Sequence, residues 1–311
     1  MYETHDPTLT IESKTYSKSN RSPKPAFLER MHELLKDEAD FQNYLDSLKT
    51  EPAVSIRCNT LKISPQDLKK RLEEKGWKIK QLFNNFPEIF IVESSLLPGE
   101  LGKSLEHQLG FFYVQEISSM LPIIALGPKP GERFLDLCSA PGSKTTQAAA
   151  KMQNKGLIIA NDKTIDRIQI LAANLERCGV SNTIITKKDG MHLCEQFAKH
   201  SFKFDKILVD APCSGEGTFR SSPKGMLMWN LKGIKQLYKI QKRLVEAASK
   251  ILNDNGTIVY STCTHAPEEN EAIVDFAVKE LGMEVETIKL PISCREGITN
   301  WKDKIFEDQV K

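Results

Sequence analysis

The sequence lacks the features that mark exported, membrane-spanning or metal-stabilised proteins. No apolar run reaches about 18 residues, the length of a transmembrane helix, and residues 1–20 are polar rather than signal-like. The seven cysteines include no C-x-x-C pair and have no neighbouring His-x-x-x-His pair, which argues against a zinc site and a disulfide framework. We therefore expect no membrane span, no metal, and a cytoplasmic protein with reduced thiols.

The chain also lacks an excess of charge of either sign. Its 43 Lys and Arg residues nearly balance 41 Asp and Glu residues, for a formal net charge of +2. Bulk charge therefore does not indicate a nucleic-acid-binding protein, and any phosphate-binding surface must come from local clustering. One such cluster is Lys69, Lys70, Arg71, Lys75, Lys78 and Lys80. Its alternative interpretation is a solvated helix face flanked by Glu73 and Glu74.

A length of 311 residues allows one large α/β domain and a smaller module. Residues 1–25, rich in Ser, Thr, Lys and Pro, predict a flexible N-terminus. Residues 26–104 predict a small α+β module, in which a helix over 26–48 precedes a β-α-β-β run. Residues 105–311 form the predicted second domain.

Short apolar strands alternate with helices in the second domain. The predicted strands are 133–138, 157–161, 183–186, 206–209 and 257–261, and the predicted helices are 144–151, 165–178, 231–252 and 268–281. Strands separated by helical crossovers predict a doubly wound, mainly parallel sheet of the Rossmann-like kind. Such sheets bind ligands beyond the carboxyl ends of their strands, so the residues that follow each strand are the candidate functional residues.

The first strand leads into Asp136-Leu-Cys-Ser-Ala-Pro-Gly-Ser-Lys-Thr145. This loop fits neither the G-x-G-x-x-G dinucleotide fingerprint nor a phosphate-binding P-loop. Its small residues and the helix N-terminus that follows are consistent with a less charged ligand, such as the amino-acid part of S-adenosylmethionine. The alternative is a purely structural turn.

Three aspartates follow later strands. Asp162 comes after the second strand, where a carboxylate can accept hydrogen bonds from ribose hydroxyls. Asp189 follows the third strand, beside the expected adenine position, and Asp210 follows the fourth. Each could instead be only a helix cap.

Two thiols stand at neighbouring strand ends, Cys213 after the fourth strand and Cys263 after the fifth. Carbon 5 of cytosine is not nucleophilic, and a thiolate that adds to carbon 6 makes it reactive toward a methyl donor. A carboxylate such as Asp210 can stabilise the protonated ring. A thiol is little ionised at neutral pH, so a positive charge from Lys144 or the donor sulfonium should assist.

These motifs resemble the Sun/Nop (RsmB/NOP) family of S-adenosylmethionine-dependent RNA (cytosine-5)-methyltransferases. The resemblance is carried by residues 136–145, by Asp210-Ala-Pro-Cys-Ser-Gly-Glu-Gly217, by Ser261-Thr-Cys-Thr264, and by the lead-in Gly110–Ser119. It implies that Cys263 is the nucleophile and that Cys213 helps to release the product. The second cysteine favours RNA over DNA, because the DNA enzymes use their Pro-Cys thiol as nucleophile.

The resemblance also implies which residues hold the cofactor. These are Cys138, Ser139, Ala140, Pro141, Gly142, Ser143, Lys144, Asp162, Arg167, Asp189 and Asp210. Asp210 and Lys144 are also expected to face the target base. The N-terminal module is similar to the family's RNA-binding lead domain.

The sequence departs from the family pattern after Leu290. The family's final strand, with its Gly-Phe-Phe-x-Ala-like segment, does not follow, and residues 298–311 are a polar tail. Either the chain is truncated or that strand is supplied differently, and a sheet edge is left open. The absence of an additional RNA-binding domain favours the archaeal-type transfer RNA enzymes over the ribosomal ones. We expect a monomer.

Three alternatives remain at this stage. Asp210-Ala-Pro-Cys213 superficially resembles the Asp-Pro-Pro-Tyr motif of amino-group methyltransferases, although it lacks the aromatic residue. The chain could be a ribosomal RNA methyltransferase, or a non-catalytic RNA-binding or ribosome-assembly factor. Residues 219–229 could cover the bound RNA or could be core packing.

Overall fold

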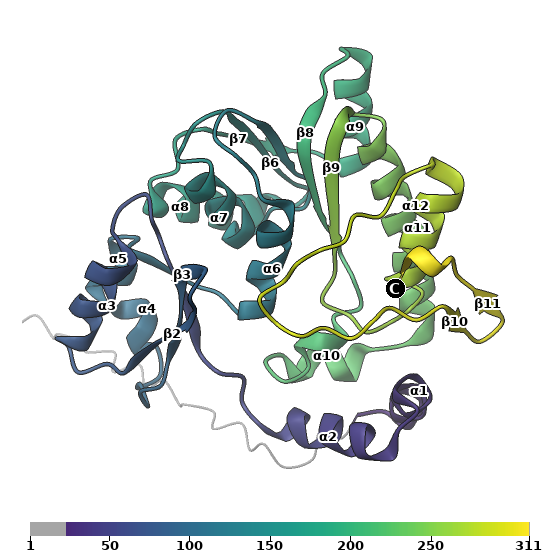
Figure 1. The fold of residues 1–311 in the computed structure, drawn as a ribbon, viewed down its shortest axis with the longest axis horizontal. Helices are drawn as coiled ribbons and strands as arrows, with labels where there is room; N and C mark the ends of the chain where they lie inside the picture. The colour runs from purple at the N-terminus through teal and green to yellow at the C-terminus, as the bar shows by residue number, and fades with distance from the viewer. Residues whose placement is uncertain (1–22, 311) are drawn as a thin grey trace, which may run out of the picture.

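The structure is a computed structural model that describes residues 23–310. The predicted flexible segment 1–25 lies outside this range except for its last three residues. A five-stranded sheet and a four-stranded sheet are the two frameworks of the fold (Figure 1).

The larger sheet is entirely parallel, with strand order β7-β6-β5-β8-β9. Its strands are β5 (Arg133–Asp136), β6 (Leu157–Asp162), β7 (Thr183–Lys187), β8 (Phe204–Asp210) and β9 (Leu252–Ser261). The chain winds outward from β5 in one direction and then crosses to β8, so the switch point lies between β5 and β8. The predicted Rossmann-like, doubly wound sheet is confirmed.

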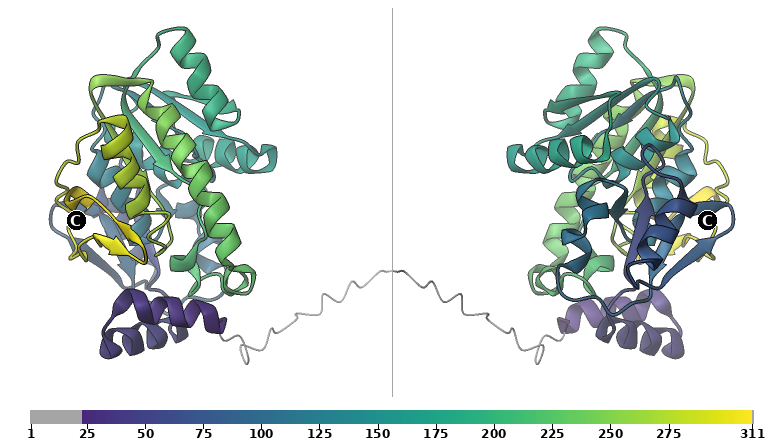
Figure 2. Two further views of the ribbon diagram at one scale, coloured as in Figure 1. Left: turned by 90° about the vertical axis from the view of Figure 1, so that its right-hand side faces the viewer. Right: turned by 90° about the vertical axis from the view of Figure 1, so that its left-hand side faces the viewer.

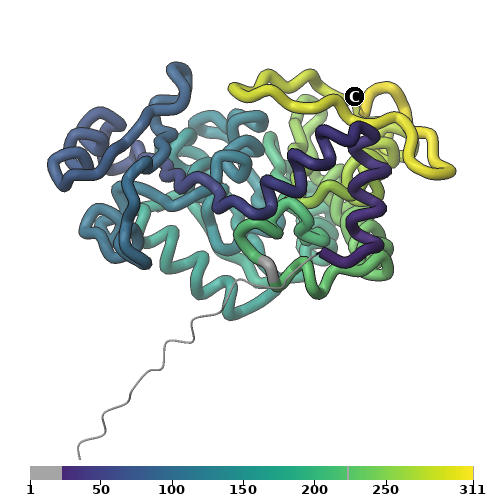
Figure 3. The backbone as a smooth tube through the Cα atoms, turned by 90° about the horizontal axis from the view of Figure 1, so that it is seen from below, coloured from purple at the N-terminus to yellow at the C-terminus, as the bar shows by residue number. Residues whose placement is uncertain are grey.

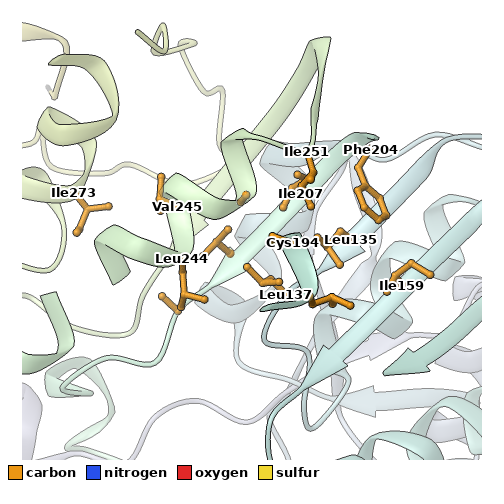
Figure 4. Packing of buried hydrophobic residues seen from close by; sticks show 14 residues of the cluster. Leu135, Leu137, Ile159, Cys194, Phe204, Ile207, Leu244, Val245, Ile251 and Ile273 are labelled. Carbon is orange, nitrogen blue, oxygen red and sulfur yellow. The ribbon is translucent and has the colours of Figure 1, made fainter. Parts of the chain in front are cut away.

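Helices cover both faces of this sheet because its strands are apolar on both sides. The helices α6 (Ile117–Leu126), α7 (Ser143–Lys151) and α8 (Ile165–Cys178) lie on one face, and α9 (Gly190–Lys199), α11 (Leu231–Ser249) and α12 (Glu271–Leu281) lie on the other. Figure 4 shows Leu244 and Val245 of α11 near Leu137 and Ile207 of the strands. Helices α6 and α9 were not predicted, since Pro122 interrupts the pattern of the first and Gly190 begins the second.

The smaller sheet is antiparallel, with strand order β2-β3-β1-β4. Its strands are β1 (Ser55–Cys58), β2 (Ile79–Phe83), β3 (Phe86–Val92) and β4 (Phe112–Val114). Helix α3 (Pro65–Glu73) packs Leu68 and Leu72 against the sheet, and the short helices α4 (Glu100–Lys103) and α5 (Leu105–Gln108) precede β4. Strand β4 completes this sheet although it lies beyond residue 104, the predicted end of the module.

The predicted helix over residues 26–48 is two helices, α1 (Pro25–Leu35) and α2 (Glu38–Lys49). Lys36 adopts a φ of 60° and ends α1, and the Asp37 side chain accepts a 2.9 Å hydrogen bond from the amide of Asp40 and begins α2. Figures 1, 2 and 3 show this pair far from β2 and β3 and against α10 (Pro223–Met228). Its core contacts include Phe219 and Trp229.

The C-terminal residues do not extend the parallel sheet. Strands β10 (Asn300–Trp301) and β11 (Lys304–Ile305) pair only with each other, and a 3-10 turn, η2 (Asp308–Val310), follows. Trp301 packs near Ala272 of α12 and not against the sheet. Within residues 23–310, no strand pairs with the outer side of β9, which is therefore an edge of the five-stranded sheet. No helix in this range is long and apolar enough to cross a bilayer.

Arg57 joins the two sheets. It lies on β1, is only 2% exposed, and donates hydrogen bonds to Gln115, to the carbonyl of Ser143 at 2.7 Å and to Thr146 Oγ1 at 2.8 Å. Burial lowers its pKa to about 10, so the guanidinium stays charged at neutral pH. Its partners on α7 directly adjoin the candidate cofactor loop.

Replacing Arg57 with alanine is expected to lower the free energy of unfolding by about 3 kcal/mol, because Gln115 and the Ser143 carbonyl would lose a buried charged donor. Urea denaturation followed by far-ultraviolet circular dichroism measures the effect. The matched control is Lys70→Ala, an exposed position, where a change within about 0.5 kcal/mol is expected. A loss below about 1 kcal/mol for Arg57→Ala would contradict the bridging role.

Candidate active site

Two adjoining cavities lie at the carboxyl ends of the parallel strands. One has a volume of ≈ 610 Å³ and the other ≈ 470 Å³. The residues that line both are Cys138, Ala140, Asp210, Ala211 and Cys263. Two ligands held in these cavities would therefore meet beside Asp210 and Cys263.

Most of the predicted cofactor residues line one of the two cavities. The smaller cavity is lined by Cys138, Ala140, Asp162, Arg167, Asp189 and Asp210, and the larger by Cys138, Ser139, Ala140, Pro141, Ser143, Lys144 and Asp210. Gly142 lines neither. It precedes α7 with a φ of 102°, and a Cβ there would stand 2.9 Å from Leu171 Cδ1, so glycine is required for the turn and for close packing.

Asp162 is held rigidly at the end of β6. It is 3% exposed, its Oδ2 lies 3.1 Å from Arg167 Nη1, and its Oδ1 accepts the amide of Thr164 at 3.0 Å. Arg167 also donates to the carbonyl of Ala140 in the first loop. Arg167 thus couples the Asp162 carboxylate to that loop.

Asp189 is both a helix cap and a cavity-lining residue. Its Oδ1 accepts the amide of Met191 at 3.1 Å and so begins α9, while its Oδ2 lies 3.1 Å from Lys163 Nζ. Burial favours a higher pKa, but the hydrogen bonds from Lys163 and the Met191 amide outweigh it and hold the pKa of Asp189 below its usual value. Asp189 therefore caps α9 and also lines the smaller cavity.

Asn161, which sequence reasoning missed, ties three strand ends together. Its side-chain amide donates to the carbonyls of Leu137 at 3.1 Å and Lys188 at 3.0 Å, and its Oδ1 accepts from Thr186 Oγ1 at 2.9 Å. These bonds fix the loops after β5 and β7 against β6. Its place directly before Asp162 was the available signal.

The two candidate catalytic thiols lie side by side. Cys213 Sγ and Cys263 Sγ are 3.2 Å apart, and the backbone amide of Cys263 donates to Cys213 Sγ at 3.3 Å. With Cys213 as donor to the Cys263 thiolate, this contact lowers the pKa of Cys263, and Lys144 adds to the effect against burial and the charge of Asp210. The same contact, with burial, raises the pKa of Cys213. The 3.2 Å contact allows either thiol to donate, and the charge of Lys144 and the directions of the two pKa shifts favour Cys263 as the thiolate.

Lys144 and Asp210 form an ion pair at the junction of the cavities. Lys144 Nζ lies 2.7 Å from Asp210 Oδ2 and 3.2 Å from Ser119 Oγ of α6. Ser261 Oγ donates to Asp210 Oδ1 at 2.7 Å, which fixes the plane of the carboxylate. Ser119 and Ser261 were not predicted as site residues, although both lie in the motif segments.

Two buried glutamates hold the cysteine loops in place. Glu269 accepts the amide of Ser214 at 3.0 Å and Gln241 Nε2 at 2.7 Å. Glu216, in the 3-10 turn η1 (Glu216–Thr218), accepts Thr264 Oγ1 at 3.0 Å and Trp229 Nε1 at 2.7 Å. Sequence reasoning missed both roles, and the presence of Glu216 within the Ser-Gly-Glu-Gly motif was the only signal.

Residues 219–229 were predicted either to cover the bound RNA or to pack in the core. Within residues 219–229, Phe219, Met226 and Trp229 are buried, as the core-packing interpretation predicts, whereas Leu227 and Met228 are exposed. No group of His, Cys, Asp and Glu side chains between residues 23 and 310 is arranged to hold a metal.

The basic cluster around α3 is largely neutralised. Glu106, which is fully buried, pairs with Arg71 at 2.8 Å and also with Lys75. Lys69 lies 3.8 Å from Glu73, and Lys80 lies 3.9 Å from Glu93. Four of the six cations therefore pair with carboxylates: Lys69 pairs with a flanking glutamate, as the solvated-face interpretation predicts, whereas Arg71 and Lys75 hold a buried one.

Alkylation of Cys263 should reveal the contact with Cys213. Removing the Cys213 S–H should raise the pKa of Cys263, and a rise of one pKa unit lowers the thiolate fraction at neutral pH about tenfold. A thiolate of higher pKa is also more nucleophilic, which offsets part of this loss. We therefore expect Cys213→Ala to slow the reaction of Cys263 with iodoacetamide at pH 7 by roughly threefold for each unit by which the pKa of Cys263 rises. Well above pH 9, where Cys263 is ionised in both proteins, the reaction should not be slowed. Mass spectrometry of the Cys263 peptide measures the rate. Cys294→Ala, a change at an exposed cysteine, is the control, and an unshifted pH profile in Cys213→Ala would disprove the assignment.

Known proteins match this chain over nearly all of its described length. A family model for the 16S rRNA methyltransferases RsmB/F matches residues 123–305, and one for the N-terminal domain of the 16S rRNA methyltransferase RsmF matches residues 24–117. A methyltransferase homologue from Pyrococcus horikoshii is 32% identical, with a TM-score of 0.73 and 92% of each chain covered. NSun6 from the same organism, solved with SFG, is 26% identical, with a TM-score of 0.76 and coverage of 87% of this chain and 91% of its own.

Two curated relatives have similar identity but different lengths. The tRNA (cytosine(49)-C(5))-methyltransferase of Pyrococcus abyssi is 42% identical over 257 residues, covering 83% of this chain and 80% of the relative. The ribosomal RNA small subunit methyltransferase F of Vibrio cholerae is 41% identical over 256 residues, which is 81% of this chain, and the chain spans 52% of that relative. The resemblance predicted from the motifs is confirmed, and the chain belongs to the RsmB/F family of RNA methyltransferases.

Proposed function

We propose that this protein transfers a methyl group from S-adenosylmethionine to carbon 5 of a cytosine in transfer RNA, through a covalent bond between Cys263 and carbon 6 of the ring. The observation that carries the proposal is the 3.2 Å pair of thiols at the junction of two cavities. One cavity suits the methyl donor and the other suits a base turned out of the RNA strand.

The smaller cavity fits S-adenosylmethionine. Asp162 offers a carboxylate for ribose hydroxyls at the end of β6. Helix α7, whose first residues Ser143 and Lys144 line the adjoining larger cavity, has no side-chain cap at Gly142, so its first amides are available to a carboxylate of a ligand that extends into that cavity. A Cβ on Gly190 would stand 2.9 Å from Leu244 Cδ2, so a larger residue there would displace a side chain that lines the cavity. When bound, S-adenosylmethionine supplies an electrophilic methyl group.

The larger cavity provides the groups that activate a cytosine. Cys263 lines it and is accessible, so its thiolate can add to carbon 6. Asp210, oriented by Ser261 and Lys144, can accept a hydrogen bond from the exocyclic amine or the protonated ring nitrogen. Lys144 also favours the thiolate form of Cys263 by its charge. Carbon 5 thereby becomes the nucleophile.

Cys213 acts in product release. After methylation, solvent water takes the proton from carbon 5, the C–H electron pair forms the double bond between carbons 5 and 6, and the bond from carbon 6 to Cys263 breaks with its electron pair returning to sulfur. A hydrogen bond from the Cys213 S–H stabilises the departing thiolate, because a thiol of lower pKa is the better leaving group. The contact that ionises Cys263 for attack therefore also assists its departure.

Transfer RNA is proposed as the substrate on the likeness to the Pyrococcus abyssi transfer RNA enzyme, which is 42% identical over 257 residues. The Vibrio cholerae ribosomal enzyme is 41% identical over 256 residues, so ribosomal RNA is the second candidate substrate. We further propose that the N-terminal module contributes to RNA binding and that the protein acts as a monomer in the cytoplasm, where its free thiols stay reduced.

Methyl transfer from labelled S-adenosylmethionine to total transfer RNA and to ribosomal RNA tests the proposal. Label should appear as 5-methylcytosine in transfer RNA with the wild-type protein. Cys263→Ala should lower the rate at least about a thousandfold, since the other thiol, Cys213, does not line the larger cavity and has a raised pKa. Cys213→Ala should accumulate a protein–RNA adduct that survives denaturing electrophoresis.

Cys294→Ala is the matched control, because Cys294 is an exposed free cysteine that lines neither cavity. It should keep wild-type activity and form no stalled adduct. Label in ribosomal RNA alone would reassign the substrate. Wild-type protein that binds the cofactor and both RNAs without transfer would favour a non-catalytic role instead.

A further inference from the structure

A long stretch of the chain after the first cysteine loop contains no acidic residue. Between Glu216 and Glu246 there is neither Asp nor Glu, although the whole chain has 41 of them. The same interval contains Arg220, Lys224, Lys232, Lys235, Lys239, Lys242 and Arg243. In a protein of net charge +2, this stretch is a strong local segregation of positive charge.

Helix α11 turns part of this stretch into an ordered row. Lys232, Lys235 and Lys239 are spaced three and four residues apart, so they lie on one face of the helix, and all three are exposed. We call these three residues the α11 lysine row. None of them forms an ion pair with any residue in the 23–310 range, in contrast to the cations around α3.

The acid-free stretch adjoins the candidate active site at two points. Gly217 and Thr218, which begin the acid-free stretch, line the larger cavity. Ile240, next to Lys239, lines the smaller cavity together with Cys213. Figure 2 shows α11 along an outer face of the molecule, above α10. The stretch therefore begins in the wall of the larger cavity and continues through α10 to a helix that borders the smaller cavity.

Apolar side chains accompany the charges where α10 meets α11. Leu227 is 48% exposed, Met228 78% and Leu231 44%. Surfaces that bind single-stranded nucleic acids combine cations for the phosphates with apolar faces for the bases. A polyanion such as RNA is repelled by every acidic residue on the surface that binds it. A partner protein or membrane with charges of both signs is not, so the complete absence of acidic residues favours a polyanion.

We propose that the α11 lysine row, with Leu227, Met228 and Leu231, binds the RNA strand that flanks the target cytosine. This inference rests on the proposed function, because it assigns a surface to the same RNA substrate. The cations hold the backbone and fix its path, and they carry no sequence information of their own.

The test compares two triple variants of equal charge loss. Lys232→Gln, Lys235→Gln and Lys239→Gln remove the row. Lys129→Gln, Lys155→Gln and Lys199→Gln remove three exposed cations near the amino ends of the parallel strands, away from the site. Binding of total transfer RNA is measured as a function of salt concentration by filter retention. A third variant with arginine at the three row positions keeps the charge.

The row variant should bind at least about tenfold more weakly at 0.1 M salt, and its slope of log affinity against log salt should fall by about 2. The arginine variant should retain binding, and the control variant should lose much less affinity and slope. Alkylation of Cys263 in the row variant should match wild type, which separates an RNA-binding defect from misfolding or damage to the catalytic pair.

Equal affinity and slope in the row and control variants would overturn the inference even if the wild type methylates RNA. Loss of binding to polyglutamate but not to transfer RNA would assign the row to an acidic protein instead, and would equally overturn it. A wild type that binds transfer RNA through the row yet transfers no methyl group would support the row and contradict the proposed activity.

Discussion

The site depends on one strand pairing, the parallel register of β8 with β9. Val209 stands opposite Tyr260, and Asp210 stands opposite Ser261. Both strands end there, so the two following loops leave the sheet at the same level and their thiols come within 3.2 Å. The buried glutamates Glu216 and Glu269 preserve this arrangement, because they bond to both loops and to the helix behind them.

In the reaction we propose, a single sulfur–sulfur contact serves two opposite steps. A hydrogen bond from Cys213 to the thiolate lowers the pKa of Cys263, which increases the amount of nucleophile at neutral pH. The same bond makes Cys263 a better leaving group when the adduct breaks down. Lys144 contributes in the same direction, while its ion pair with Asp210 keeps the carboxylate oriented toward the shared wall of the cavities.

Net charge close to zero conceals two very different basic surfaces. Around α3, Arg71 and Lys75 surround a buried glutamate and stabilise the small domain. Along α11, three exposed lysines form no ion pair with any carboxylate of residues 23–310. A count of charges cannot separate these cases, since the partner of Arg71 lies 35 residues away in the sequence.

The sequence by itself determined the parallel sheet, the order of its strands along the chain and the residues at their carboxyl ends, because apolar periodicity and strand-end motifs are local properties. It therefore predicted Cys213, Cys263, Asp210 and most of the cofactor loop. Only the tertiary structure decided that Lys36 breaks the first helix, that β4 joins the small sheet and that Asn161 ties three loops together. The last two depend on partners distant in the sequence, which no local pattern encodes, whereas the break at Lys36 is a local backbone conformation that apolar periodicity does not reveal.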